Sequence, residues 1–305
     1  MALKSDWIWM DGQLVPWEDA TVHVLSHVIH YGTGVFEGIR AYQTAAGPAV
    51  FRLSEHVDRL FDSAKILYMD IPFEREQIRS AIVDTIRANN LDSGYIRPVV
   101  YRGLGQLGID PDPCPVNVFI AVWPWGAYLG EEALQKGIRA KISSWTRNYI
   151  NSFPAKGKIN GGYVNSILAH IEARKCGYDE AIFLDSDGYV AEGSGENIFW
   201  VKNAVIYTTP LATVLKGITR DSVVELAQDM GHDVVETRAA RDELYLADEI
   251  WFCGTAAEIT PVREIDGHTI GSGERGPITK ALQERFFAVA QGKEPAYSKW
   301  LTLVR

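Results

Sequence analysis

The chain has 305 residues, 47% hydrophobic and 23% charged, which is typical of a globular protein with one large or two ordinary domains. Its formal net charge of −9, without a block of basic residues, argues against a nucleic-acid partner, which requires a basic surface. No apolar run approaches the roughly 20 residues of a membrane-spanning helix, so we expect no membrane partner.

The first part of the chain has the pattern of an α+β domain. Asp11-Gly12 between two apolar runs predicts a hairpin. Residues 30–44 predict a loop, a strand and a turn. Apolar residues at helical spacing predict one helix from Ser54 onward and a second over 74–90, followed by strands over 94–103 and 116–125. Strands, then helices, then strands again favour the α+β class.

Pro124 and Gly126 interrupt this periodicity. We therefore predict a small domain over 1–123, a linker over 124–135 and a large domain over 136–305. The large domain is expected to begin with a strand over 138–145 and a helix that ends at Gly177.

The remaining elements of the large domain follow from turn residues and periodicity. Two hairpins are predicted, with turns at Asp187-Gly188 and at Lys202-Asn203. A helix within 216–231 is expected after a Gly217-Ile218-Thr219 loop, with Asp221 as its N-cap. The last predictions are a strand over 232–239, a short helix over 242–247, a strand over 249–255, a hairpin over 262–271 and a helix over 276–292.

The cysteines and histidines do not predict a metal site. The three cysteines lack ligand spacing and are interpreted as small buried residues of a reducing compartment: Cys114, Cys176 and Cys253. Three neighbouring histidines have no ligand motif around them and are interpreted as structural: His23, His27 and His30. The N-terminal segment has no signal-peptide apolar core, so we expect a cytoplasmic protein.

Lys156 and Lys158, in the stretch PAKGKINGGYVN, are candidates for a reactive amine, although a solvated loop explains most such lysines. A free lysine has a pKa of about 10.4, so it must be desolvated or lie near positive charge to form a Schiff base. If pyridoxal phosphate were the carbonyl partner, its phosphate would need backbone N–H groups and an arginine. Its ring nitrogen would need a carboxylate, and its phenolic oxygen a hydrogen-bond donor.

Each of these demands has a candidate with an ordinary alternative. Gly217-Ile218-Thr219 and Gly254-Thr255-Ala256 offer backbone N–H groups but are also common loop sequences. Glu192 is a carboxylate at a strand end, and Arg59 lies off the apolar stripe of its helix, where a solvated arginine is usual. Two polar residues share one strand face, where rim residues are usual: Tyr95 and Arg97. No single signal selects a pyridoxal enzyme.

Taken together, these stretches resemble the branched-chain amino acid aminotransferases, in the fold-type IV group of pyridoxal-phosphate enzymes. The resemblance covers almost the whole chain and is carried by HYGTGVFEGIRAY, FRLSEHVDRLFDSAKIL, YIRPVVYRG, GYVAEGSGENIFWV, GITRDSV and GTAAEITPV. It implies an α+β, two-domain fold in which a smaller N-terminal α/β domain and a larger C-terminal domain hold the cofactor between them.

The resemblance also implies cofactor roles. The family places its Schiff-base lysine five residues before a tyrosine, which selects Lys158 and Tyr163 and leaves Lys156 as a solvated neighbour. Lys158 would also move the substrate proton, Tyr163 would bind the phenolic oxygen, and Glu192 would pair with the ring nitrogen. The other cofactor-binding positions that match are Arg59, Gly217, Ile218, Thr219, Gly254 and Thr255.

For the substrates, amino acids and 2-oxo acids, the resemblance implies one pocket with two uses. Tyr95 and the amides of Thr255 and Ala256 would hold the α-carboxylate, and Arg97 would receive the side-chain carboxylate of glutamate. The apolar pocket matches Tyr31, Phe36, Gly38 and Trp125. A loop of the neighbouring subunit, with Leu107 and Ile109, would complete the site, which implies a homodimer or a higher homo-oligomer.

The expected reaction is transfer of the amino group of L-leucine, L-isoleucine or L-valine to 2-oxoglutarate. One alternative is a fold-type IV transaminase for D-amino acids or (R)-amines, against which YIRP and GTAAEITPV argue. Another is a lyase similar to aminodeoxychorismate lyase. A third is a non-catalytic cofactor-binding protein, which the combination of Lys158, Tyr163 and Glu192 makes improbable.

Overall fold

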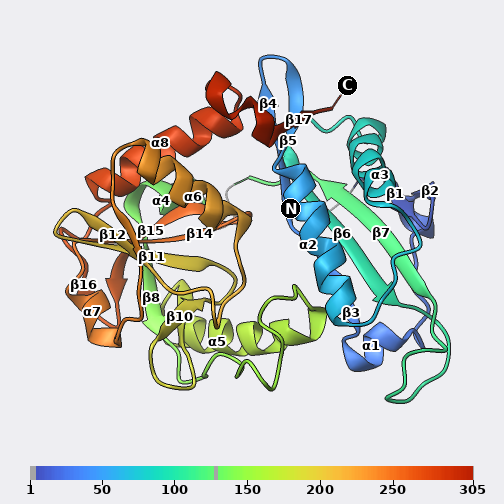
Figure 1. Cartoon of the computed structure of the whole chain (residues 1–305), viewed down its shortest axis with the longest axis horizontal. Helices are drawn as coiled ribbons and strands as arrows, with labels where there is room; N and C mark the ends of the chain where they lie inside the picture. The colour runs from blue at the N-terminus through green and yellow to red at the C-terminus, as the bar shows by residue number, and fades with distance from the viewer. Residues whose placement is uncertain (1–4, 127–129, 305) are drawn as a thin grey trace. The chain divides into compact units, whose positions relative to one another are not determined.

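A computed structural model describes residues 5–126 and 130–304, which form two compact units (Figure 1). Unit 1 contains the described residues of Met1–Trp125, Gly157–Gly162 and Ala288–Arg305. Unit 2 contains those of Gly126–Lys156 and Tyr163–Phe287. Each unit combines one β-sheet with helices, which is the predicted α+β class.

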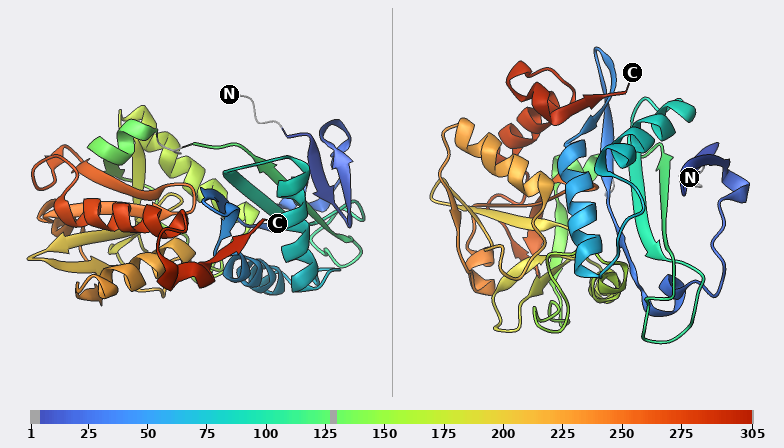
Figure 2. Two further views of the ribbon diagram at one scale, coloured as in Figure 1. Left: turned by 90° about the horizontal axis from the view of Figure 1, so that it is seen from above. Right: turned by 45° about the vertical axis from the view of Figure 1, so that its right-hand side comes forward.

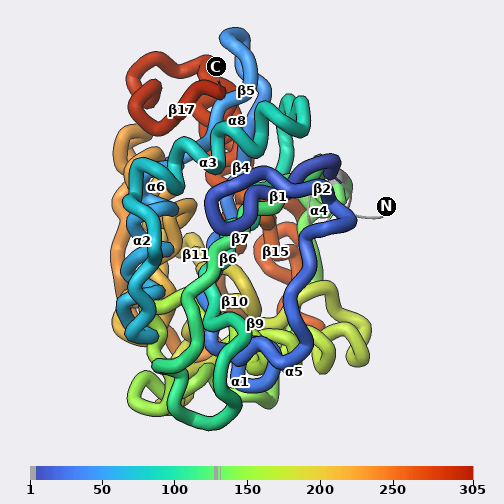
Figure 3. The backbone as a smooth tube through the Cα atoms, turned by 90° about the vertical axis from the view of Figure 1, so that its right-hand side faces the viewer, coloured from blue at the N-terminus to red at the C-terminus, as the bar shows by residue number. Residues whose placement is uncertain are grey.

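Unit 1 is built on an antiparallel sheet with the strand order β17-β5-β4-β6-β7-β1-β2, in which β3 pairs with β6. Asp11 and Gly12 form the turn of the predicted first hairpin, whose first strand pairs with β7 and whose second strand lies at the edge of the sheet (Figure 3). The strands are β1 (Trp7–Met10), β2 (Gln13–Pro16), β3 (Gly34–Phe36), β4 (Ile39–Thr44), β5 (Gly47–Phe51), β6 (Gly94–Arg102), β7 (Val116–Trp123) and β17 (Leu301–Leu303).

Two long helices, α2 (Leu53–Ile66) and α3 (Arg75–Ala88), cover one face of this sheet (Figure 2). Val57 and Leu60 of α2 are fully buried, as the predicted apolar stripe requires. The shorter helical elements of unit 1 are η1 (Trp17–Asp19), α1 (His27–Tyr31), η2 (Asn160–Gly162) and η3 (Pro295–Trp300).

The sequence predicted two continuous domains with one linker between them. In the structure, two segments from the later part of the chain also belong to unit 1. β17 pairs with β5, and Ile159 forms an isolated β-bridge with Val35 of β3. Backbone hydrogen bonds to a sheet therefore fix both segments. Such pairing between distant parts of the sequence leaves no local pattern. Residues 127–129 of the predicted linker lie outside the described residues.

Unit 2 is built on a mixed sheet with the order β10-β9-β8-β15-β14-β11-β12-β13, in which β16 pairs with β15. Parallel pairs join β8 to β9, β8 to β15, and β12 to β13. The strands are β8 (Ile138–Ile142), β9 (Glu180–Leu184), β10 (Val190–Gly193), β11 (Asn197–Lys202), β12 (Val205–Thr208), β13 (Val234–Glu236), β14 (Glu249–Gly254), β15 (Glu258–Ile265) and β16 (His268–Thr269).

The helices of unit 2 pack on this sheet: α5 on β8 and β9, α6 on β13 and β14, and α4 on β15. Phe199 and Trp251 stack at the centre of the sheet with ring centroids 5.4 Å apart, and both are fully buried. The helices are α4 (Glu131–Lys136), α5 (Tyr163–Lys175), α6 (Ile218–Asp229), α7 (Arg241–Tyr245) and α8 (Pro277–Ala290). The last three residues of α8 belong to unit 1.

Most predicted elements are present, and several details differ. The β11–β12 turn lies at Asn203-Ala204 rather than Lys202-Asn203, because both central residues of this tight turn have positive φ, at 51° and 63°. The short helices α1 and α4 were not predicted. Cys176 is exposed, contrary to its interpretation as a buried residue, because it lies beyond the end of α5.

Neither a membrane span nor a metal-binding group occurs in the described part of the chain. Within residues 5–126 and 130–304, no helix is both long enough and apolar enough to cross a membrane. The same described residues contain no group of three or more histidine, cysteine, aspartate or glutamate side chains that could hold a metal ion.

Candidate active site

Lys158 is held in unit 1 by its backbone. Its carbonyl accepts a hydrogen bond of 3.0 Å from the N–H of Phe36, and its own N–H donates one of 3.0 Å to Ser63 Oγ. Its Nζ lies 5.0 Å from the centroid of the Phe36 ring. These contacts give the lysine a fixed base on β3 and α2, which the glycine-rich sequence around it did not indicate.

Lys156 has different surroundings, in unit 2. Its side chain is exposed overall, while its Nζ donates a hydrogen bond of 3.0 Å to the carbonyl of Val214. Partial burial of the amine lowers the pKa of Lys156, the charge of Arg220 lowers it further, and the charge of Glu192 opposes both. The structure thus gives this lysine a carbonyl partner in addition to its contact with water.

Arg59 forms a bidentate ion pair with Glu37. Arg59 Nε lies 2.6 Å from Glu37 Oε1, and Arg59 Nη2 lies 2.8 Å from Glu37 Oε2. His56 Nδ1 lies 2.8 Å from the same Oε2 atom. The Glu37 side chain is 0% exposed, that of His56 2% and that of Arg59 13%. The position of Arg59 off the apolar stripe therefore indicates a buried ion pair and not a solvated residue.

This cluster shifts two titrations. Burial alone would raise the pKa of Glu37, but the charge and hydrogen bonds of Arg59, with the hydrogen bond of His56, hold that pKa well below its ordinary value. Burial lowers the pKa of His56, and the hydrogen bond and charge of Glu37 oppose this shift without cancelling it. At neutral pH the cluster therefore contains an ionised Glu37, a charged Arg59 and a neutral His56.

Tyr95 and Arg97 lie on one face of β6, as strand alternation predicts. Arg97 Nη2 donates a hydrogen bond of 3.2 Å to the Tyr95 hydroxyl. The Arg97 guanidinium carbon lies 4.6 Å from the centroid of the Phe36 ring and 5.2 Å from that of the Tyr95 ring. Among the described residues no ion pair joins a carboxylate to Arg97, and its Nε is buried without a hydrogen-bond partner. The Arg97 guanidinium thus lies against apolar rings, and its Nε–H group has no hydrogen-bond acceptor among the described residues.

Gly38 leaves space for this arrangement. A Cβ atom at Gly38 would lie 1.9 Å from the Tyr95 hydroxyl oxygen, which no real contact tolerates. Trp125 packs edge-on against Tyr95 with ring centroids 4.6 Å apart, and its carbonyl accepts a hydrogen bond of 3.0 Å from Arg40 Nη2. Three predicted substrate residues thus contact Tyr95: Gly38, Arg97 and Trp125.

The other predicted substrate residues of unit 1 are more exposed. Tyr31 lies on α1, is 47% exposed, and its ring centroid lies 4.5 Å from that of His27. Leu107 is 43% exposed and Ile109 is 93% exposed, in the connection between β6 and β7. The carbonyl of Gly108, between these two residues, lies 2.8 Å from His27 Nε2. The loop is therefore fixed at its centre while its apolar side chains face solvent.

In unit 2, Glu192 is a buried residue of β10 with two polar partners. Arg147 Nε donates a hydrogen bond of 2.8 Å to Glu192 Oε1, and Asn197 Nδ2 lies 3.3 Å from Glu192 Oε2. The Glu192 side chain is 7% exposed and that of Arg147 is 17% exposed. This arrangement places a guanidinium group beside a buried carboxylate. Tyr163 is the first residue of α5 and is half-buried.

The first turn of α6 begins one residue after Gly217, so the predicted N-cap at Asp221 is wrong. Gly217 is the N-cap, Ile218 and Thr219 are helical and buried, and Asp221 N donates to the carbonyl of Gly217. Gly217 has no side chain to cap the first N–H groups, which together with the helix dipole favours an anion. A Cβ at Gly217 would lie 2.0 Å from Asn197 Oδ1.

The segment after β14 presents further small groups. Gly254 ends that strand, and Thr255 and Ala256 follow it as half-buried residues before β15 begins at Glu258. A Cβ at Gly254 would meet only ordinary contacts, the nearest at 3.6 Å from the carbonyl of Gly195. This segment therefore offers backbone N–H groups, and its packing does not require a glycine at position 254.

Sequence reasoning missed four residues that the structure connects to predicted ones: Glu37, His56, Arg147 and Asn197. Glu37 and Asn197 lie within the motifs FEGIR and GSGEN, where a polar residue next to or within an apolar strand was an available signal. Arg147 lies in a connection without any distinctive pattern. Only the folded chain brings it to Glu192.

Known proteins similar to this chain belong to the family that the sequence motifs predicted. A model of the family described as amino-transferase class IV matches residues 34–265. The chain is 53% identical over 305 residues to a branched-chain-amino-acid aminotransferase of Pseudomonas aeruginosa, and the match covers 100% of this chain and 99% of that protein.

Solved structures agree as well. A branched-chain amino acid aminotransferase of the organism abbreviated T.th., with pyridoxamine 5′-phosphate, has a TM-score of 0.97 at 52% identity, covering 100% of both chains. The same aminotransferase complexed with N-(5′-phosphopyridoxyl)-L-glutamate has a TM-score of 0.96 at 50% identity, also covering 100% of both. The chain belongs to the class IV amino-transferase family.

Proposed function

We propose that this protein is a branched-chain-amino-acid aminotransferase that uses pyridoxal 5′-phosphate. It transfers the amino group of L-leucine, L-isoleucine or L-valine to 2-oxoglutarate in two half-reactions. The relatives with this name match over the full chain, and one of them was solved with pyridoxamine 5′-phosphate and with a phosphopyridoxyl-glutamate compound. The observation in the chain itself that carries the proposal is the contact of Arg97 with the Phe36 ring.

That contact suits two chemically different substrates. The rings of Phe36 and Tyr95 offer apolar surface to a branched aliphatic side chain, and the Arg97 guanidinium offers a cation to the side-chain carboxylate of glutamate or 2-oxoglutarate. We assign Tyr95, Thr255 and Ala256 as donors to the α-carboxylate. Tyr31, Phe36, Gly38 and Trp125 are assigned to the apolar wall.

The residues present fit the cofactor. The uncapped N-terminus of α6, with Gly217, Ile218 and Thr219, suits its phosphate. Glu192, which accepts a hydrogen bond from Arg147, suits a protonated ring nitrogen. The remaining cofactor assignments are Arg59, Tyr163, Gly254 and Thr255. When bound, pyridoxal phosphate supplies an electron-withdrawing ring that stabilises negative charge on the substrate Cα.

Lys158 Nζ moves the proton in this proposal. As a neutral amine it removes the proton from the substrate Cα as a general base, and as an ammonium group it later returns a proton as a general acid. The backbone bonds of Lys158 to Phe36 and Ser63 hold the base of the side chain, so that only its flexible methylene chain has to move. Lys156, tied to the carbonyl of Val214, takes no part.

We also propose a homodimer as the minimum assembly. One face of α5 exposes four apolar side chains in unit 2: Val164, Ile167, Leu168 and Ile171, which are 59%, 54%, 37% and 44% exposed. In unit 1, Leu107 and Ile109 are exposed as well. Contiguous exposed apolar surface of this kind typically contacts another subunit.

The predicted domain limits and a cytoplasmic location remain proposals. The cytoplasmic location is supported by three cysteines that form no disulfide.

A spectroscopic experiment tests the function. The purified protein is expected to be yellow, to lose its visible absorbance when L-leucine is added, and to recover it when 2-oxoglutarate follows. D-alanine is expected to leave the absorbance unchanged. A response to D-alanine alone would support the D-amino acid alternative, and release of pyruvate without an amino acceptor would support the lyase. A colourless protein that no amino donor affects would contradict the proposal.

A second experiment tests the lysine assignment. Borohydride reduction of the yellow protein, followed by peptide mapping, is expected to place the pyridoxyl group on Lys158. The matched control is present in the same peptide, because Lys156 lies two residues away. A pyridoxyl group on Lys156 would overturn the assignment of Lys158.

A further inference from the structure

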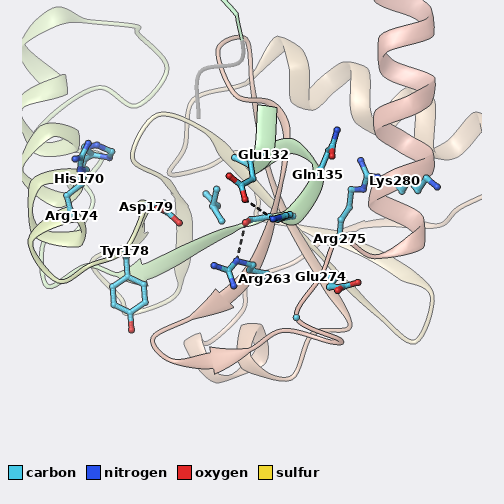
Figure 4. Close-up of a pocket in the computed structure, with 15 residues that line it drawn as sticks. Glu132, Gln135, His170, Arg174, Tyr178, Asp179, Arg263, Glu274, Arg275 and Lys280 are labelled. Carbon is cyan, nitrogen blue, oxygen red and sulfur yellow. Dashed lines mark hydrogen bonds and ion pairs between the residues drawn. The ribbon is translucent and has the colours of Figure 1, made fainter. Parts of the chain in front are cut away.

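Unit 2 contains a cavity of about 1360 Å³ that none of the proposed catalytic residues lines (Figure 4). Its wall is formed by α4, α5, the start of β8, β15, the connection before α8, and α8 itself. Six basic side chains line it: Lys136, His170, Arg174, Arg263, Arg275 and Lys280. Three acidic side chains line it as well: Glu132, Asp179 and Glu274. The wall is therefore basic in a chain whose net charge is −9.

One acidic side chain interacts with an arginine of the wall: the hydrogen bond and charge of Lys136 lower the pKa of Glu132, and the charge of Arg263 adds to this shift. Glu132 Oε1 pairs with Lys136 Nζ at 2.8 Å, and Asp179 Oδ2 accepts a hydrogen bond of 2.8 Å from the backbone N–H of Arg139. In the described part of the chain, no ion pair joins a carboxylate to any of the three arginines of the wall, which are Arg174, Arg263 and Arg275. The charges of Arg174 and Arg275 are available to a ligand, and that of Arg263 is partly balanced by Glu132.

Two of these arginines are held in place by uncharged groups. Arg263 Nε donates a hydrogen bond of 3.2 Å to the carbonyl of Gly137. Arg275 Nη1 donates to Gln283 Oε1 at 2.9 Å, and Gln283 is only 2% exposed. The Gln283 amide is fixed in turn, because its Nε2 donates to the carbonyl of Ile259 at 2.6 Å. Both guanidinium groups are therefore positioned before any ligand arrives, which lowers the entropy lost on binding.

On the opposite wall, α5 contributes the exposed cation of Arg174, together with His170, whose charge a buried carboxylate balances. His170 Nδ1 lies 3.1 Å from Glu180 Oε1, whose side chain is fully buried. Figure 4 shows His170 and Arg174 on one side of the cavity and Arg275 and Lys280 on the other. A ligand that satisfied both sides would need anionic groups at two separated positions.

We propose that this cavity binds a small anion carrying two or more phosphate or carboxylate groups. Planar guanidinium groups match both kinds of oxyanion with paired hydrogen bonds. Ligand pockets are typically about 300–1,000 Å³, so the volume admits such a molecule together with water. A single carboxylate is not sufficient, because one partly exposed ion pair contributes only about 0–1 kcal/mol.

Isothermal titration calorimetry on the cofactor-loaded protein tests this proposal, with pyrophosphate and citrate as probes at an ionic strength of about 0.15 M. At least one probe is expected to bind, and the stronger of the two identifies the phosphate or the carboxylate class. The variants R263Q and R275Q are each expected to bind it about tenfold more weakly, which corresponds to about 1.4 kcal/mol. Acetate is expected not to bind.

R238Q is the matched control, because Arg238 is an arginine of unit 2 that pairs with Asp185 and Asp187 and lies outside the cavity wall. It should bind the probe like the unaltered protein. R174Q tests the same charge at an exposed position where the substitution does not disturb packing, and it is expected to weaken binding even if R263Q fails to fold.

Three results would overturn the proposal. The first is a lack of binding by both probes, and the second is an equal loss of affinity in R238Q and R174Q. The third is a change in molar mass by light scattering in R174Q with unchanged affinity, which would assign the basic wall to a contact with a second copy of the chain. None of these results depends on the proposed aminotransferase activity.

Discussion

Glu37 and Arg59 form a two-pronged ion pair, at 2.6 and 2.8 Å, in which the carboxylate is 0% exposed and the guanidinium side chain 13% exposed. Arg59 is the arginine that we assign to the cofactor phosphate. An isolated arginine on a helix surface would sample many rotamers, whereas Glu37 fixes two of its nitrogen atoms. The pair is therefore a positioning device as well as a structural contact.

We predict that E37Q destabilises the protein by about 3 kcal/mol or more, because removing one partner leaves the other charge uncompensated in a buried position. Urea unfolding monitored by fluorescence measures this change. D58N is the matched control, on the helix that carries Arg59, since Asp58 pairs with Arg75 and Arg79 while its side chain remains 51% exposed. D58N should cost less than about 1 kcal/mol. Equal losses in both variants would contradict a buried, paired Glu37.

The same cluster predicts a pH dependence of stability. The folded-state pKa of His56 is lowered from 6.5, so below pH 6.5 the unfolded chain takes up a proton that the folded chain does not. Stability is therefore expected to fall as the pH decreases from 6.5. Glu37 adds a second loss below pH 4.5, where the unfolded carboxylate becomes protonated and the folded one, with its lowered pKa, does not.

Unfolding free energies measured between pH 7.5 and 5.5, roughly one unit either side of the histidine pKa, test the first part. In H56N the amide can still donate a hydrogen bond to Glu37 but cannot be protonated, so the slope below pH 6.5 should decrease. H23N, at an exposed histidine, should keep the slope of the unaltered protein. An unchanged slope in H56N would show that another group is responsible.

The contact between Gly38 and Tyr95 predicts strong intolerance of a methyl group. In G38A the new Cβ would lie 1.9 Å from the Tyr95 hydroxyl oxygen, so the tyrosine has to move away from Arg97. We expect a loss of about 1–3 kcal/mol in stability from overpacking and a raised KM for L-leucine. Adding Y95F should make the cost of G38A smaller, since the closest atom is then absent. A double-mutant cycle without coupling between the two sites would contradict this.

A corresponding contact in unit 2 predicts the behaviour of G217A. The added Cβ would lie 2.0 Å from Asn197 Oδ1, and Asn197 also contacts Glu192. Displacement of Asn197 should weaken cofactor binding, which dialysis followed by absorbance of the released cofactor measures. G195A is the control, because a Cβ at Gly195 would meet nothing within 4 Å and Gly195 has no assigned role in cofactor binding. Cofactor loss that is equal in the two variants would argue against a role for the Gly217–Asn197 contact.

Local patterns predicted the elements well, because helices and hairpins are specified by neighbouring residues. The stripe of Val57 and Leu60 placed α2, and Asp11-Gly12 placed the first hairpin. Pairing between distant residues could not be predicted in this way. β17 adds to β5, and Ile159 bridges Val35, through backbone bonds that do not depend on side-chain pattern.

The candidate site shows the same division. Tyr95 and Arg97 were correctly placed on one strand face, since this follows from alternation alone. The partner of Arg59 was not predictable, because Glu37 lies 22 residues away and no spacing rule connects a strand end to a helix surface. The start of α6 was misplaced at Asp221, since Gly217, Thr219 and Asp221 are all acceptable cap types and only tertiary packing selects among them.

The last prediction separates the two substrates of the proposed reaction. Arg97 lies against the rings of Phe36 and Tyr95, and we assign it to the side-chain carboxylate of glutamate. In R97M the apolar surface remains while the cation is lost. The half-reaction with L-glutamate should therefore lose about 1.5–3 kcal/mol of transition-state stabilisation, a factor of about 10 to 150 in kcat/KM.

The half-reaction with L-leucine provides an internal comparison, because leucine has no side-chain carboxylate and should change far less in R97M. Stopped-flow absorbance with each amino donor alone measures the two rates separately. R75M, at a surface arginine of α3 with a 47% exposed side chain, should leave both rates unchanged. If R97M reduced the rates with leucine and glutamate equally, Arg97 would serve the architecture of the pocket rather than the recognition of the second carboxylate.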